Sequence, residues 1–102
     1  MTGTLQTFAA IIGPIRLVAD GLGYTVAVHG SLKRDIDLVA IPWTKDAAGR
    51  DDLVKAICER LGGLRAHDGW RQRPHGRWVQ IIRIPELNPD TYLDLSIMEL
   101  RP

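Results

Sequence analysis

Cysteine is nearly absent from this sequence, since Cys58 is the single one among 102 residues. One cysteine excludes an internal disulfide framework and an all-cysteine zinc site, and it fits a reducing, cytoplasmic setting best. Long apolar runs are also lacking, because none approaches the roughly 18 residues of a membrane helix, so we expect no membrane association. With 45% hydrophobic and 25% charged residues, the composition is that of a globular protein, and we expect residues 1–102 to form a single domain.

Net charge is low as well. Thirteen Lys and Arg against twelve Asp and Glu give a formal charge of +1, which excludes a nucleic-acid signature over the whole chain. Residues 60–83 nevertheless hold six arginines, opposed only by Asp68. This stretch is either a solvated loop or a surface for phosphate or nucleic acid. Trp70 and Trp78 lie among the arginines and could stack on bases, but we expect Trp78 and Trp43 to close the core and Trp70 to be exposed.

The spacing of apolar residues predicts three helices. The first covers Thr4–Ile12, where Gly13-Pro14 interrupts the pattern. Pro14 is suited to the first position of a second helix, which glycines end at residues 21–23. A third helix covers residues 51–61, and Gly62-Gly63 ends it.

Four apolar segments predict β-strands, and residues 64–76 between them are expected to form a loop. The first two strands are joined too tightly for a parallel crossover, so we expect them to be antiparallel. The order of elements predicts a small α/β (α+β) protein in which a mixed or antiparallel four-stranded sheet carries its helices on one face. The four segments are Tyr24–His29, Asp35–Trp43, Arg77–Ile84 and Thr91–Met98.

Three aspartates lie on the predicted strands. Asp35 and Asp37 are two residues apart and therefore project from the same face. Asp94 lies within an apolar strand, where an unpaired charge is costly. Carboxylates held close together repel each other unless a cation or proton lies between them, and hard oxygen ligands suit Mg²⁺ or Mn²⁺. The three predict a shared metal site; the alternative for Asp94 is a sheet-edge acid paired with Arg83.

Gly30 and Ser31 follow the strand that precedes this aspartate pair. Glycine permits close backbone approach, and serine offers a hydroxyl and a backbone N–H to a phosphate oxygen. Lys33, Arg34 and Arg77 add positive charge for the same ligand. The alternative interpretation is a charged hairpin turn.

Together these motifs resemble the nucleotidyltransferase fold of the DNA polymerase β superfamily, especially its small "minimal nucleotidyltransferase" members. The resemblance covers roughly residues 24–98. It implies that Gly30 and Ser31 are the phosphate-binding motif and that Asp35 and Asp37 are the metal-binding pair. Asp94 is implied as the third carboxylate, which assists as ligand or base.

The resemblance implies metal-dependent transfer of a nucleoside monophosphate from a nucleoside triphosphate to a hydroxyl acceptor. Only three residues separate Ser31 from Asp35, a shorter link than is usual in the family. This spacing keeps open a second hypothesis, in which the same fold binds a protein or nucleic-acid partner without turnover. A homodimer is a further possibility, because an exposed strand edge favours pairing.

Overall fold

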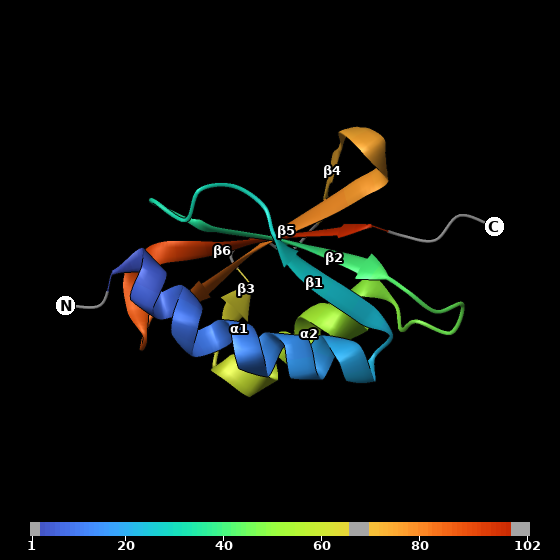
Figure 1. Cartoon of the computed structure of the whole chain (residues 1–102), viewed down its shortest axis with the longest axis horizontal. Coiled ribbons are helices and arrows are strands. Elements are labelled where there is room, and N and C mark those ends of the chain that lie inside the picture. Colours follow the sequence, from blue (N-terminus) through green and yellow to red (C-terminus); the bar gives the residue numbers. More distant parts are fainter. Residues whose placement is uncertain (1–2, 66–69, 99–102) are drawn as a thin grey trace.

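The computed structural model describes residues 3–65 and 70–98, which form two helices packed on a twisted sheet (Figure 1). Helix α1 covers Thr4–Gly21 and helix α2 covers Arg50–Leu61. Both helices lie on the same side of the sheet (Figure 1), as the sequence predicts. The strands are β1 (Tyr24–Val28), β2 (Ile36–Pro42), β3 (Leu64–Arg65), β4 (Arg71–Arg73), β5 (Arg77–Ile84) and β6 (Asn88–Met98).

The sheet is mixed, with the strand order β1-β2-β6-β5-β3 and with β4 paired to β5. Strands β1 and β2 are antiparallel, as expected, and the remaining pairs are also antiparallel except for β2 and β6. The four predicted strands correspond to β1, β2, β5 and β6. The predicted fold class is therefore confirmed, and two short strands are added to it.

Alternate residues of the strands build the core. Ile36, Leu38, Leu93 and Leu95 are at most 1% exposed, and they belong to one apolar cluster with residues of both helices. Their neighbours in sequence therefore point to the other side of the sheet. We call that side the open face, because neither of the two described helices covers it (Figure 1).

The prediction of two helices before residue 24 is wrong, because α1 continues through Pro14. A proline inside a helix leaves the carbonyl four residues earlier without its donor. Here that carbonyl belongs to Ala10, an exposed residue, so water can satisfy it. The buried stripe of Thr7, Ile11, Ile15 and Ala19 runs past the proline, and this packing outweighs the local break.

The prediction of a loop over residues 64–76 is also wrong in part. Strand β3 and the short strand β4 form there, and a 3₁₀ turn over Pro74–Gly76 (η1) joins β4 to β5. His75 and Gly76 have φ values of 69° and 72°, which close the turn tightly. The hairpin rises from the sheet on the side away from the helices (Figure 1). His67, Asp68 and Gly69 lie outside the described residues.

Neither helix in the described part of the chain is sufficiently long and apolar to cross a lipid bilayer.

Candidate active site

The register of the parallel strands β2 and β6 brings two of the predicted aspartates together. Asp37 and Asp94 are direct partners across these strands, and both are half-buried. Each lies between core residues of its own strand, so both carboxylates lie on the open face. Asp35 is also half-buried and comes two residues before Asp37. The sequence predicts that Asp35 and Asp37 project from the same face. The register of β2 and β6 places Asp94 beside Asp37 on that face.

Burial and neighbouring carboxylates raise the pKa of Asp37 and that of Asp94. The pKa of Asp37 lies above its ordinary value of 3.8, chiefly because of burial and next because of Asp35, while His29 lowers it. Burial also raises the pKa of Asp94, followed by the charge of Asp37. Arg73 and Arg77 oppose that rise, and Asp35 adds to it. A site of this kind favours a proton or a cation between its acids.

The backbone of Gly30 lies directly against the carboxylate of Asp37. Its φ is +104°, and a Cβ atom there would come within 2.8 Å of Asp37 Oδ2. The backbone N–H of His29 also donates to the Asp37 carbonyl at 2.7 Å. The Gly30-Ser31 turn is thereby held beside the carboxylates, and only glycine fits at its first position without strain. The Ser31 side chain is exposed.

The short link from Ser31 to Asp35 is held by the start of α1. The Thr4 hydroxyl donates to the Arg34 carbonyl at 3.1 Å. Leu32 has a positive φ of 59° and packs partly against the core. The side chains of Lys33 and Arg34 are exposed, and the pKa shifts of Asp37 and Asp94 include no contribution from either of them.

Arg77 lies on the same side as Asp94. It begins β5 opposite Met98, and Met98 and Asp94 alternate onto the open face of β6. Its Nε donates to the Pro74 carbonyl at 3.3 Å. Arg73, its cross-strand partner, also lowers the pKa of Asp94. Sequence reasoning missed Arg73 as a site residue; the alternation of Arg71 and Arg73 could have indicated it if β4 had been expected.

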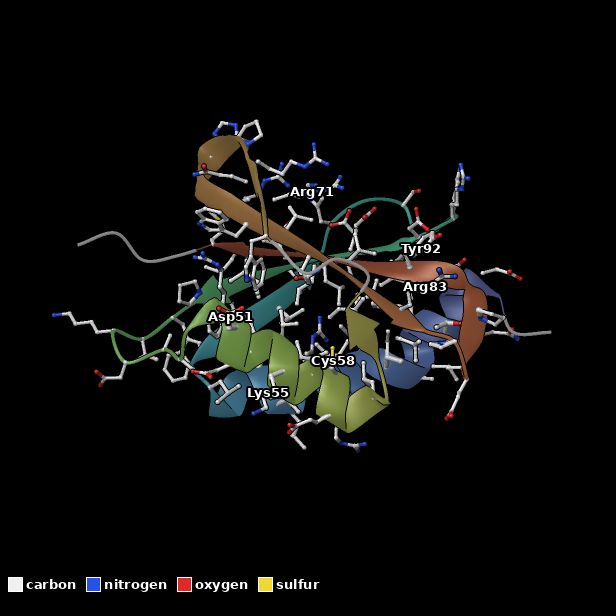
Figure 2. All side chains as sticks on the ribbon, turned by 180° about the vertical axis from the view of Figure 1, so that it is seen from behind. Asp51, Lys55, Cys58, Arg71, Arg83 and Tyr92 are labelled. Atoms are coloured by element: carbon white, nitrogen blue, oxygen red, sulfur yellow. The ribbon has the colours of Figure 1, made fainter. Side chains whose placement is uncertain are left out.

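The alternative pairing of Asp94 with Arg83 is not what the structure shows. The Arg83 guanidinium lies 5.1 Å from the centroid of the Tyr92 ring, and its Nη2 donates to the Pro89 carbonyl at 3.4 Å. Figure 2 shows Arg83 and Tyr92 together at one end of the sheet. The cations that act on Asp94 come instead from β4 and the start of β5.

The expected roles of the tryptophans are only partly right. Trp43 is 62% exposed and does not close the core, because the chain turns away at Pro42, where β2 ends. Trp70 is half-buried rather than exposed, and its Nε1 donates to Asp51 Oδ1 at 2.8 Å. Trp78 is half-buried, with the guanidinium of Arg50 4.1 Å from its ring centroid.

The donor set agrees with the predicted metal in kind. Carboxylate oxygens are the ligands that Mg²⁺ and Mn²⁺ prefer, and mutual repulsion of the acids favours a cation among them. Within residues 3–65 and 70–98, however, no three His, Cys, Asp or Glu side chains lie close enough together to hold one ion. Any ion would draw the side chains inward or complete its shell with ligand oxygens and water.

Comparison with known proteins gives a match at the level of structure. No family model and no curated protein matches the sequence. The fold is similar to that of the Cid1 poly(U) polymerase in a crystal structure with MgGTP bound, with a TM-score of 0.59 and 14% sequence identity. The match covers 92% of this chain and 32% of that one, so the chain spans about a third of the polymerase. At this identity the likeness shows the fold alone, and it confirms the predicted nucleotidyltransferase-like fold.

Proposed function

We propose that the protein is a metal-dependent nucleotidyltransferase, which transfers a nucleoside monophosphate from a nucleoside triphosphate to a hydroxyl acceptor. One observation carries the proposal: Asp37 and Asp94 are paired on neighbouring strands of the open face, with the Gly30 backbone against Asp37. This juxtaposes acids for a divalent cation with a turn able to receive phosphate. MgGTP bound to the similar polymerase fold supports Mg²⁺ and a nucleotide as ligands.

Separate residues bind the metal, bind the phosphates and supply positive charge in the proposed reaction. Asp35, Asp37 and Asp94 would hold Mg²⁺ or Mn²⁺, which when bound neutralises charge on the phosphates and stabilises the leaving oxygen. Gly30 and Ser31 bind phosphate oxygens through backbone N–H groups and the serine hydroxyl. Lys33, Arg34 and Arg77 add positive charge around them.

Transfer is an in-line displacement. The acceptor hydroxyl oxygen forms a bond to the α-phosphorus as the bond to pyrophosphate breaks. The hydroxyl proton passes to the Asp94 carboxylate, whose raised pKa makes it a better base than an ordinary aspartate. The proposal further takes residues 1–102 to be one domain and the protein to act in the cytoplasm.

Calorimetry tests the nucleotide site. We expect MgATP to bind to the unmodified protein and Asp37→Asn to weaken binding by at least about tenfold, or about 1.4 kcal/mol. Asp46→Asn removes an exposed carboxylate from the loop after β2 and is the matched control. Equal binding by all three proteins, or none by any, would contradict the proposal.

A second candidate function is nucleotide or partner binding without turnover. It is favoured by the side-chain positions of the described acids, which do not form a ready-made ion site, and by the three-residue link between Ser31 and Asp35. Pyrophosphate release distinguishes the two candidates. Steady release that Asp94→Asn abolishes supports transfer, whereas tight binding with no release from any nucleoside triphosphate supports the binding module and a protein or nucleic-acid partner.

A further inference from the structure

The hairpin that rises over the open face carries an excess of positive charge. We call residues 71–79 the arginine hairpin; they comprise β4, η1 and the start of β5. Arg71 pairs with Val79, and Arg73 pairs with Arg77, so the three arginines share one face. That face is the open one, because Val79 lies opposite Ser96 and Arg77 opposite Met98 on β6. The sequence has no acidic residue between Trp70 and Pro85.

The pairing of Arg73 with Arg77 is unfavourable by itself. Like charges directly opposite each other on neighbouring antiparallel strands destabilise a sheet. Asp94 acts on both guanidiniums, but one half-buried carboxylate does not neutralise two cations, and Arg71 adds a third. The Arg71 and Arg73 side chains are exposed. An anion with several oxygens is the ligand that would offset this repulsion, since guanidinium groups bind phosphate oxygens in pairs.

Residues at the base of the arginine hairpin contact helix α2. The Arg50 guanidinium lies 4.1 Å from the ring centroid of Trp78 and 5.3 Å from that of Trp70. The Trp70 indole also donates to Asp51 at 2.8 Å. Figure 2 shows Asp51 on α2, on the other side of the sheet from Arg71. These contacts fix the backbone where β4 begins, so the positions from which the arginine side chains project are set before any ligand arrives.

The same contacts determine what the hairpin can recognise. Trp70 and Trp78 are the only Trp, Tyr or Phe residues between positions 70 and 84, and both already interact with the Arg50 guanidinium. Stacking on a nucleobase needs an aromatic face that is available. The arginine hairpin therefore has the means to bind phosphate, while both of these indole rings are engaged by Arg50 and its single remaining aromatic ring is the small imidazole of His75 at the turn.

We propose that Arg71, Arg73 and Arg77 form a phosphate-binding arm, which holds phosphate groups above Asp94 by charge and independently of base identity. The inference deepens the proposed function and rests on it for the identity of the site. The phosphates have two sources: the triphosphate tail of the nucleotide, or the phosphates of an acceptor.

The test uses the full chain and titration calorimetry with inorganic tripolyphosphate in the absence of metal. We expect Arg71→Gln/Arg73→Gln to weaken binding by about tenfold or more, the effect of losing charge-assisted hydrogen bonds. Two controls each remove one cation: Lys55→Gln on the outer side of α2, and Arg83→Gln at the far end of the open face (Figure 2). Both should bind as the unmodified protein does. A double variant that binds as tightly as the controls overturns the proposal.

Two further titrations distinguish the sources of phosphate. If the double variant weakens MgATP binding, the arm holds the triphosphate tail; if it weakens only the binding of a short mixed-sequence phosphodiester strand, the arm holds acceptor phosphates. Strand binding that depends on base sequence overturns the proposal.

The Asp37→Asn variant distinguishes the phosphate-binding arm from the proposed nucleotidyl transfer. Loss of MgATP binding with tripolyphosphate binding intact supports both the arm and the transfer. Tripolyphosphate binding without any MgATP binding supports the arm and contradicts nucleotidyl transfer.

Discussion

The covered and open faces of the sheet are made by alternate residues of the same strands. On β6, Leu93 and Leu95 are almost fully buried beneath the helices, while Asp94 between them is half-buried on the open face. On β2, Ile36 and Leu38 flank Asp37 in the same way. The covered face stabilises the fold by burying apolar side chains. The open face holds like-charged carboxylates close together, which destabilises the fold.

The largest expected effect comes from the covered face. Leu95→Ala removes a fully buried side chain and should lower the free energy of unfolding by about 2–5 kcal/mol. Its neighbour gives the matched contrast, because Asp94→Asn should leave stability unchanged or raise it by removing a charge whose pKa is raised. Urea unfolding of the two variants measures both. A loss for Asp94→Asn as large as for Leu95→Ala would erase the distinction between the faces.

A smaller effect is expected where the open face meets the Gly30-Ser31 turn. Gly30→Ala places a Cβ atom against Asp37 at a φ of +104°, and we expect a loss of about 1–3 kcal/mol with weaker MgATP binding. Gly13→Ala is the control, since a Cβ at that helical position meets nothing within 4 Å and should stabilise α1 by up to about 1 kcal/mol. Thermal unfolding and calorimetry measure the two quantities. Equal stability of the two variants would show that Gly30 does not hold the carboxylate.

The smallest expected effect is a pH dependence that comes from the open face. The pKa values of Asp37 and Asp94 are raised in the folded protein above 3.8. At pH values between 3.8 and the raised pKa values, the folded state therefore binds more protons than the unfolded state. Stability should therefore rise as pH falls from neutrality through the raised pKa values, and the gain should be complete only below the ordinary value of 3.8. Urea unfolding at a series of pH values measures the slope. Asp37→Asn/Asp94→Asn should flatten it, and an unchanged slope would assign the effect to other groups.

Much of this organisation could be predicted from local patterns. Alternation along residues 91–98 indicated which side of that strand is apolar, and the two-residue spacing of Asp35 and Asp37 predicted a shared face for them. The continuous apolar run at Leu38–Ile41 indicated a strand covered on both faces, which is wrong, because neither described helix covers the open face of β2 (Figure 1). The four long strands and the position of the helices followed from the same patterns. These features depend on neighbours in sequence, which is why sequence reasoning reached them.

The remaining features depend on contacts between distant segments. The pairing of Asp37 with Asp94 requires β2 and β6 to be adjacent and parallel in one register, which no local pattern specifies. The continuity of α1 through Pro14 follows from packing along a stripe that the proline does not interrupt. Arg73 became a site residue only because β4 folds back on β5, and Trp70 is half-buried because it reaches α2.

The parallel β2–β6 pair also has a consequence for the order of folding. More than half of the chain lies between Asp37 and Asp94. Closing so long a loop costs conformational entropy, which is offset only once β2 and β6 have formed their contacts. The β1–β2 hairpin can form as soon as its own residues are synthesised, but the carboxylate pair exists only after β6 has left the ribosome and docked between β2 and β5. A nascent or truncated chain that lacks β6 thus carries the turn at Gly30 without the acid that completes the pair, and we expect such a chain to lack the site.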